Sequence, residues 1–359
     1  MGITIAATVF VFSLIVFVHE FGHFITAKLT GMQVDEFAIG FGPKIYSCTY
    51  GSTLYSLRAV PLGGFNRIAG MTEDEPLNER SFLNKPVPSR LLVIAAGGIM
   101  NFLLAILILW GVTFAVGTMT VSPQAVVGSV IENSAASQAD MQEGDRIVSI
   151  GGTAITQWSD ISQAVAEHSR SVVTVVVERD GKELSLDMIP QVDSQSQRAT
   201  LGIMPVITKQ SHGFFESAGM AVQRTGQLCQ LMLVGIYEMI TGETKADLAG
   251  PIGVAQLAGQ VASVGFVNLL VFTAFLSINL GILNLLPIPL LDGGYIILLI
   301  LEGISGRRMP KKALQYIQAT GMVILGALFL FAMFQDITRI CKSPTEEDKY
   351  WFPDIAGLL

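Results

Sequence analysis

Four runs of apolar residues, each near the length that a helix needs to cross a lipid bilayer, dominate this chain of 359 residues. Only 14% of the residues are charged, against about 25% in an ordinary soluble domain, and 51% are hydrophobic. The chain is therefore predicted to be an α-helical membrane protein with four transmembrane segments, at 3–26, 91–116, 266–303 and 315–336. A cleaved signal peptide is disfavoured for the first run, because no Lys or Arg precedes Lys28.

The distribution of basic residues orients these four segments. The connection 27–90 holds seven Lys and Arg and the link 304–313 holds four, whereas the N-terminus has none and the tail 337–359 has three. Under the positive-inside rule the first two connections face the cytoplasm and both termini lie outside it. The net charge of −7 disfavours a nucleic-acid partner, and three widely spaced cysteines suggest neither disulfides nor a cysteine zinc cluster.

Three stretches outside the spans have their own patterns. Residues 53–68 are predicted as a β-hairpin around a Pro-Leu-Gly-Gly turn, apolar enough to dip into the membrane against protein or a wet cavity. Residues 117–205 alternate short β-rich runs with turns and one helical stretch at 158–167, which indicates an inserted α+β domain. Residues 210–248 are predicted as amphipathic or connector helices.

The first apolar run contains His19-Glu20-Phe21-Gly22-His23, a match to H-E-x-x-H. Two histidines four residues apart share one face of a helix and can bind zinc, and the intervening Glu20 can act as general base. The five-residue match is weak in a soluble protein. Inside a bilayer each ionisable group costs about 2–3 kcal/mol, so this trio indicates a functional site.

A catalytic zinc needs a third protein ligand, and Asp292 is the candidate. It is the only carboxylate between Asp247 and Glu302. The first and third spans cross in the same direction, which brings both motifs to the cytoplasmic end. Pro287 and Pro289 are expected to break the helix just before Asp292 and to leave backbone that lines a cavity.

Asn284 precedes this break, and its amide can both donate and accept hydrogen bonds. Two interpretations stay open. Asn284 either holds the backbone of a peptide unwound for cleavage or caps a half-helix.

The sequence resembles the site-2 protease family of intramembrane zinc metalloproteases, especially its bacterial branch of the regulator of sigma-E protease type. The resemblance rests on HEFGH at 19–23, FGP at 41–43, PLGGF at 61–65 and NLLPIPLLDG at 284–293. It implies Zn²⁺ as the cofactor, His19, His23 and Asp292 as its ligands, and Glu20 as the catalytic base. These are the roles already assigned from chemistry.

The same resemblance extends to substrate binding and to the inserted domain. It implies that 53–68 is a membrane-reentrant β-loop that pairs with extended substrate through Gly63, Gly64 and Phe65, with Asn284 contributing from the opposite side. The inserted domain is similar to a PDZ domain, because QEGDRIVSIGG at 142–152 matches its core pattern. Some relatives carry two such domains, and this chain has room for one.

The predicted function is therefore intramembrane zinc-dependent proteolysis of single-span membrane proteins, such as anti-sigma factors or remnant signal peptides. An upstream site-1-type protease is expected to shorten the substrate first, with the PDZ-like domain as size filter or docking site. The expected location is the bacterial inner membrane, with the active site near the cytoplasmic side. Two alternatives remain: a metal transporter that uses the same His and Asp cluster, and a catalytically silent PDZ scaffold.

Overall fold

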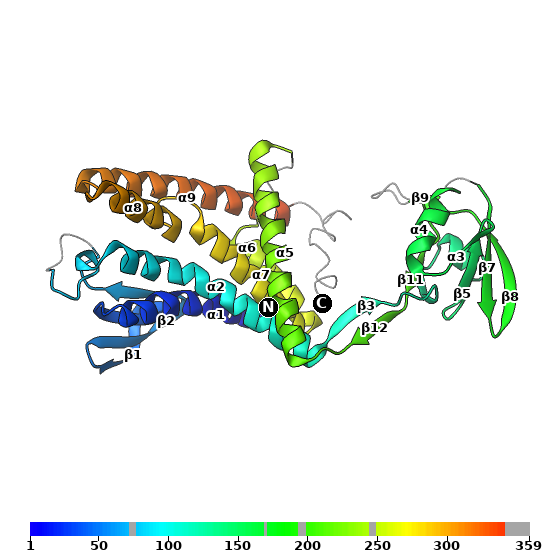
Figure 1. Cartoon of the computed structure of the whole chain (residues 1–359), viewed down its shortest axis with the longest axis horizontal. Helices are drawn as coiled ribbons and strands as arrows, with labels where there is room; N and C mark the ends of the chain where they lie inside the picture. The colour runs from blue at the N-terminus through cyan, green and yellow to red at the C-terminus, as the bar shows by residue number, and fades with distance from the viewer. Residues whose placement is uncertain (72–76, 169–170, 193–198, 244–248, 342–359) are drawn as a thin grey trace. The chain divides into compact units, whose positions relative to one another are not determined.

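The computed structural model describes residues 1–71, 77–168, 171–192, 199–243 and 249–341 (Figure 1). The chain divides into two compact units. One combines Met1–Ala115 with Gly213–Leu359 and is mainly helical, and the other is the strand-rich Val116–His212.

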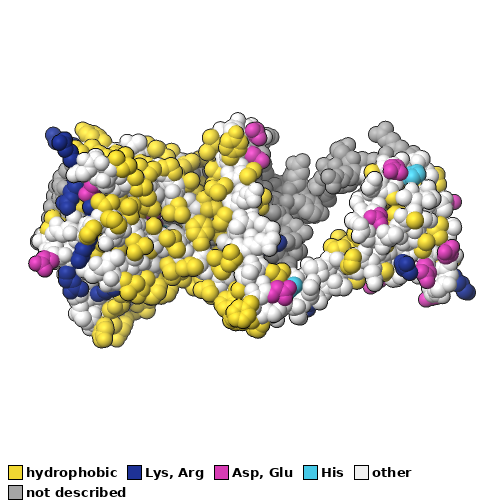
Figure 2. Space-filling model, viewed as in Figure 1, with side chains coloured by type: hydrophobic (Ala, Val, Ile, Leu, Met, Phe, Trp, Pro, Cys, Tyr) yellow, Lys and Arg dark blue, Asp and Glu magenta, His cyan; other side chains and the backbone are white. Residues whose placement is uncertain are grey.

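Among the described residues, four helices of the helical unit are long and apolar enough to cross a membrane. They are α1 (Gly2–Leu29), α2 (Val87–Val116), α7 (Phe266–Leu285) and α9 (Lys311–Cys341). Figure 2 shows hydrophobic side chains over most of the visible face of this unit, with Lys and Arg gathered at one end. Such a surface matches a lipid environment and a polar boundary at that end.

The third apolar run is interrupted at its two prolines. Helix α7 ends at Leu285 and helix α8 (Asp292–Ser305) begins at Asp292, so Pro287 and Pro289 lie in the non-helical link between them. A Cβ atom added at Gly293 would lie 2.2 Å from the carbonyl oxygen of Leu286, and one added at Gly294 would lie 2.4 Å from the carbonyl oxygen of Ile288. The link therefore folds tightly back on the start of α8, and only glycine fits there.

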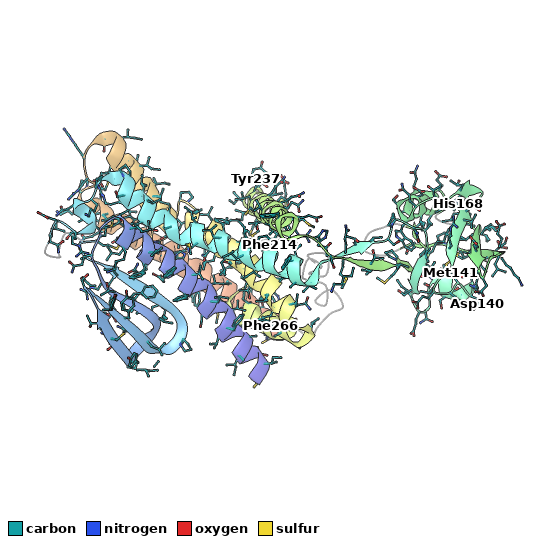
Figure 3. The ribbon with its side chains drawn as sticks, turned by 60° about the horizontal axis from the view of Figure 1, so that its bottom comes forward. Asp140, Met141, His168, Phe214, Tyr237 and Phe266 are labelled. Carbon is teal, nitrogen blue, oxygen red and sulfur yellow. The ribbon has the colours of Figure 1, made fainter. Side chains whose placement is uncertain are left out.

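Two further helices belong to the helical unit. Helix α5 (Phe214–Thr241) falls in the predicted connector region, with Phe214 and Tyr237 near its two ends (Figure 3). Helix α6 (Pro251–Val264) was not predicted. Its N-terminal amides donate to the buried carboxylate of Asp336 on α9, over 2.9–3.0 Å from Gly250, Ile252 and Gly253. The carboxylate that caps α6 comes from a distant residue, so the local sequence offers only Pro251 at the first helical position as a start signal.

The predicted hairpin within 53–68 is wrong in its pairing. Strands β1 (Val34–Tyr50) and β2 (Thr53–Ile68) are antiparallel, and their turn is at Gly51 and Ser52, where Gly51 has φ +60°. Phe37 faces Tyr55 on one side and Asn66 on the other, so both halves of β2 flank β1 rather than each other. The Pro-Gly-Gly turn signal was local, whereas the partner strand lies about twenty residues earlier in the chain.

The strand-rich unit has the elements expected of its alternating pattern. Its main sheet has the order β6-β5-β7-β8, with β5 (Arg146–Ile150), β6 (Thr153–Ala154), β7 (Val173–Arg179) and β8 (Lys182–Met188). The short helices are α3 (Ala135–Gln138) and α4 (Trp158–Ala166). Smaller strand pairs complete the unit: β3 (Thr118–Val121) with β12 (Ile207–Gln210), β4 (Val127–Val130) with β11 (Ile203–Pro205), and β9 (Gln191–Val192) with β10 (Ala199–Thr200).

The core of this unit is apolar, with one buried ion pair at its edge. Met141, labelled in Figure 3, is 4% exposed and packs in the same cluster as Ile147 and Val175. The fully buried carboxylate of Asp145 accepts two hydrogen bonds of 2.7 Å from Arg179. Burial raises the pKa of Asp145, but the bonds from Arg179 and from the Gln142 amide outweigh it, so the net pKa is lowered.

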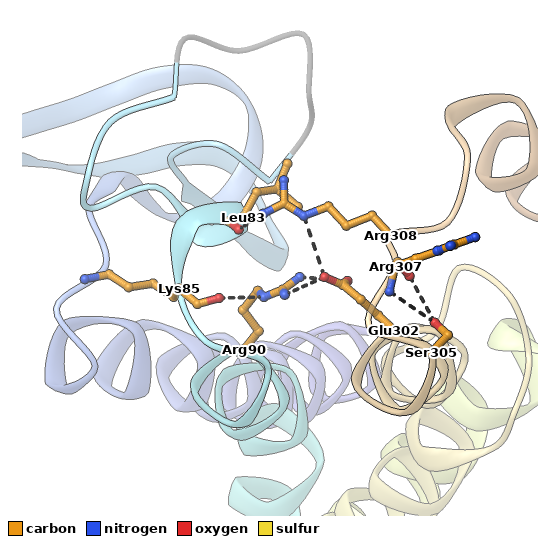
Figure 4. Close-up of polar contacts among 7 residues, drawn as sticks. All are labelled: Leu83, Lys85, Arg90, Glu302, Ser305, Arg307 and Arg308. Carbon is orange, nitrogen blue, oxygen red and sulfur yellow. Dashed lines mark hydrogen bonds and ion pairs between the residues drawn. The ribbon is translucent and has the colours of Figure 1, made fainter.

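A second ion pair ties α2 to α8 in the helical unit (Figure 4). The guanidinium of Arg90, which is 4% exposed, donates to both carboxylate oxygens of Glu302 at 2.7 Å and 3.0 Å. Arg308 also approaches Glu302, at 3.6 Å. Because Asp292 and Glu302 are on the same helix, this pair fixes α8 against α2.

Removing one member of the pair should destabilise the helical unit. In Arg90→Met the largely buried Glu302 loses both hydrogen bonds from Arg90 and keeps only the longer contact with Arg308, so the free energy of unfolding is expected to fall by about 3 kcal/mol. The measurement is thermal unfolding in detergent. The double variant Arg90→Met/Glu302→Met should recover part of the loss, and failure to recover would contradict this account.

Asp160 gives the strand-rich unit an acid-sensitive contact. The backbone amide of Gln157, followed by the amide and hydroxyl of Thr156, lowers the pKa of Asp160 to about 2. A carboxyl group whose pKa is lower in the folded than in the unfolded state stabilises the fold at pH values above its unfolded-state pKa. This contribution is lost as the pH falls through the folded-state pKa. We expect protection of α4 amides from hydrogen exchange to fall between about pH 4 and pH 2, and to fall less in Asp160→Asn.

Candidate metal centre

Three predicted ligands converge in the helical unit from two helices. His19 and His23 lie one turn apart on α1, and Asp292 is the first residue of α8. The two Nε2 atoms are 3.2 Å apart, and each lies 3.5 Å from Oδ2 of Asp292. These three atoms form a nearly equilateral triangle.

The triangle has the dimensions of a zinc site. With metal–ligand bonds of about 2.1 Å, a tetrahedral centre separates its ligands by about 3.4 Å. Oδ2 of Asp292 is buried and has no hydrogen-bond partner among the described residues. A buried carboxylate oxygen of this kind is explained by a cation, so the three residues fit Zn²⁺ with a fourth position left for water or substrate.

The outer nitrogens of the two histidines contact α2. Nδ1 of His23 lies 2.8 Å from the carbonyl oxygen of Val93, which can accept its proton and leave Nε2 free for a metal. Nδ1 of His19 lies 3.3 Å from the amide of the buried Asn101 and 3.5 Å from that of Asn284. A 180° rotation of the Asn101 amide lets its otherwise unpartnered Oδ1 accept the Nδ1–H of His19.

Glycines on both helices allow this close approach. A side chain at Gly97 on α2 would begin 2.3 Å from Nε2 of His23 and 2.7 Å from Cε1 of His19. A side chain at Gly22 on α1 would begin 2.5 Å from the carbonyl oxygen of Ala96. Both imidazoles therefore occupy space that only glycine leaves open.

A cavity of about 330 Å³ opens onto the three ligands. Its lining also includes Glu20, Phe65, Asn66 and Asn284, beside His19, His23 and Asp292. Glu20 therefore shares one cavity with the metal ligands. A substrate in this cavity would touch α1, β2 and the link before α8.

The predicted site residues have different places around this cavity. Phe65 and Asn284 line it. Gly64 packs beside Glu20, with its Cβ position 3.7 Å from Cγ of that residue and 2.5 Å from the carbonyl oxygen of Ala38. Gly63 has φ +112°, a backbone conformation that favours glycine, and lies against the ring of Phe41.

Sequence reasoning missed three residues of the site: Asn66, Gly97 and Asn101. A signal for the last two was present, since Gly97 and Asn101 are one helical turn apart in the second apolar run, where a polar amide is costly. Asn66 directly follows the predicted Phe65 and carried no separate pattern.

Two imidazoles and a carboxylate around one point, with a glutamate in the same cavity and helices of membrane-spanning length, define a membrane-embedded metallohydrolase. The family model for Peptidase family M50 matches residues 7–328, and the chain belongs to this family.

Similar proteins cover nearly the whole chain. The regulator of sigma-W protease RasP of Bacillus subtilis is 31% identical, and the match covers 94% of this chain and 99% of that protein. The zinc metalloprotease RasP of Bacillus licheniformis is 32% identical with the same coverage, and a Fusobacterium nucleatum protein named as a candidate zinc metalloprotease is 34% identical. A Listeria monocytogenes PDZ domain aligns with 24% of the chain at 18% identity and a TM-score of 0.22.

The chain is thus a multi-pass membrane protein and a zinc metalloprotease, as predicted. The transporter alternative is not favoured, and a silent scaffold does not agree with membership of a peptidase family.

Asn101 should control how tightly the metal is held. Replacing it by Leu removes the acceptor that orients His19, and loss of such a partner weakens zinc binding about 10- to 100-fold. Chelator competition on purified protein measures this affinity. Asn101→Asp keeps an acceptor and serves as control, and unchanged affinity in Asn101→Leu would contradict the assignment.

Proposed function

We propose that this chain hydrolyses a peptide bond of single-span membrane proteins within the bilayer, at the site formed by His19, His23, Asp292 and Glu20. The observation that carries the proposal is the triangle of three ligand atoms, 3.2–3.5 Å on a side, in a cavity that also contains Glu20. Bound zinc supplies Lewis acidity that polarises the scissile carbonyl and acidifies a water.

Side chains around the metal site are proposed to transfer the proton and to bind the substrate. Glu20 takes the proton from the attacking water and passes it to the leaving amine nitrogen. The amide of Asn284, near the end of α7, lines the same cavity and is proposed to bind substrate backbone. Residues 64–68 form an edge of the sheet, because their paired partners are all on one side, in 34–39. An extended substrate can pair with the open edge, which supports the proposed re-entrant role of β1 and β2.

The charge distribution of the helical unit supports a proposed membrane orientation. His23 is six residues before the end of α1, or about 9 Å along the helix, and so lies near the basic end that contains Arg90 and Arg308. Under the positive-inside rule we propose that this end is cytoplasmic and that both termini and the strand-rich unit lie outside. We infer the bacterial cytoplasmic (inner) membrane from the bacterial sources of the relatives.

The substrate class is inferred from likeness and from chemistry. The Bacillus subtilis relative is named for its regulation of sigma-W, so anti-sigma factors are the proposed substrates, with remnant signal peptides as a second class. The strand-rich PDZ-like unit is proposed to exclude or dock the outer part of the substrate. Prior cleavage by a site-1-type protease would then be required.

The test co-expresses the chain with a single-span reporter truncated on its outer side. We expect wild type to cleave it, Glu20→Gln to retain zinc without cleavage, and Asp292→Asn to lose both. Zinc is measured in the purified proteins by mass spectrometry and cleavage by gel shift of the reporter. Equal cleavage by all three would refute the proposed roles, and metal transport that survives Glu20→Gln would favour the transporter.

A further inference from the structure

Asn66 is a buried amide that the protein does not satisfy. It lies on β2 opposite Phe37 of β1 and lines the cavity that contains the metal ligands. Both Oδ1 and Nδ2 are buried, and neither has a hydrogen-bond partner within the described part of the chain. Most buried side-chain amides in folded proteins are hydrogen-bonded, so an amide with both polar atoms unpaired needs an explanation.

The position of Asn66 on the strand directs it to the reacting region. Alternate residues of a strand share a face, so Gly64 and Asn66 point the same way. The Cβ position of Gly64 is 3.7 Å from Cγ of Glu20, which shows that this face of β2 packs toward the proposed general base. The neighbouring Arg67 is exposed and does not line the cavity.

We propose that the Asn66 side chain binds the backbone of one extended substrate residue beside the scissile bond, with Nδ2 donating to the C=O of that residue and Oδ1 accepting from its N–H. In an extended chain the N–H and C=O of one residue point to the same side, so a neutral amide with one donor and one acceptor is complementary to them. A transmembrane substrate that unwinds in a cavity exposes such N–H and C=O groups, and in a membrane each must find a partner.

This inference rests on the proposed function and adds a residue to it. The open edge of β2 satisfies substrate backbone groups in the plane of the sheet, whereas Asn66 acts from the face of the sheet. The amide thereby holds a second peptide group in line with Glu20. Water molecules that fill the cavity are the competing explanation for its unpaired atoms.

The test separates binding from cleavage. In the inactive Glu20→Gln background, the affinity for the truncated single-span reporter in detergent is compared with and without Asn66→Leu, a change of similar size without polar atoms. Loss of two neutral hydrogen bonds should weaken binding about tenfold. In the active protein, Asn66→Leu should lower kcat/KM by a similar factor with zinc content unchanged.

The midpoint of thermal unfolding distinguishes substrate binding from a structural role, because loss of a structurally important side chain would lower it. Because the amide lacks internal partners, Asn66→Leu should leave the midpoint of thermal unfolding unchanged or raise it. Asn84→Leu, at an exposed asparagine that does not line the cavity, is the matched control and should leave reporter binding unchanged.

Three outcomes would overturn the proposal. Unchanged reporter binding in Asn66→Leu would indicate that only water contacts the amide. A lowered unfolding midpoint would indicate partners within the protein. The third outcome is an equal loss of binding in the control Asn84→Leu. Asn66→Asp keeps Oδ1 but not the donor, and its binding should fall between wild type and Asn66→Leu. If wild type binds the reporter in an Asn66-dependent way but never cleaves it, the proposed function fails while this inference stands.

Discussion

The close approach of α1 and α2 is the constraint on which the rest of the structure depends. Gly22 and Gly97 bring the two backbones together, and the space saved at Gly97 is filled by the imidazoles of His19 and His23. Polar groups this deep in an apolar helix would be unfavourable unless each had a partner. The partners come from α2, through Val93 and Asn101, and from Asp292 on α8.

The broken third span follows from this requirement. In a continuous helix the backbone around Asp292 would be fully hydrogen-bonded, and the Asp292 side chain would point from one fixed face of the helix. The prolines end α7 at Leu285, and the tight link restarts the chain as α8 with Asp292 in its first turn. The break thus supplies both a ligand and the irregular backbone that lines the cavity.

The metal ligands of this site were predictable because they lie in short sequence motifs. The spacing of His19, Glu20 and His23, the isolation of Asp292 and the prolines before it were enough to place the metal ligands together. The unpredicted parts depend on long-range contacts. The pairing of 34–41 with both halves of β2, the capping of α6 by Asp336, and the environment of Asn66 all involve partners that no local pattern specifies.

The Arg90–Glu302 pair joins α2 and α8 without help from the metal. The close packing at Gly22 and Gly97 likewise holds α1, which carries His19 and His23, against α2. Because neither contact needs the ion, we expect the three helices to stay assembled when it leaves and the apoprotein to keep a preformed receptor for it. Zinc exchange then becomes a local event rather than a folding transition, so a protein stripped by a chelator can be reconstituted in place, without passing through an unfolded chain in the bilayer.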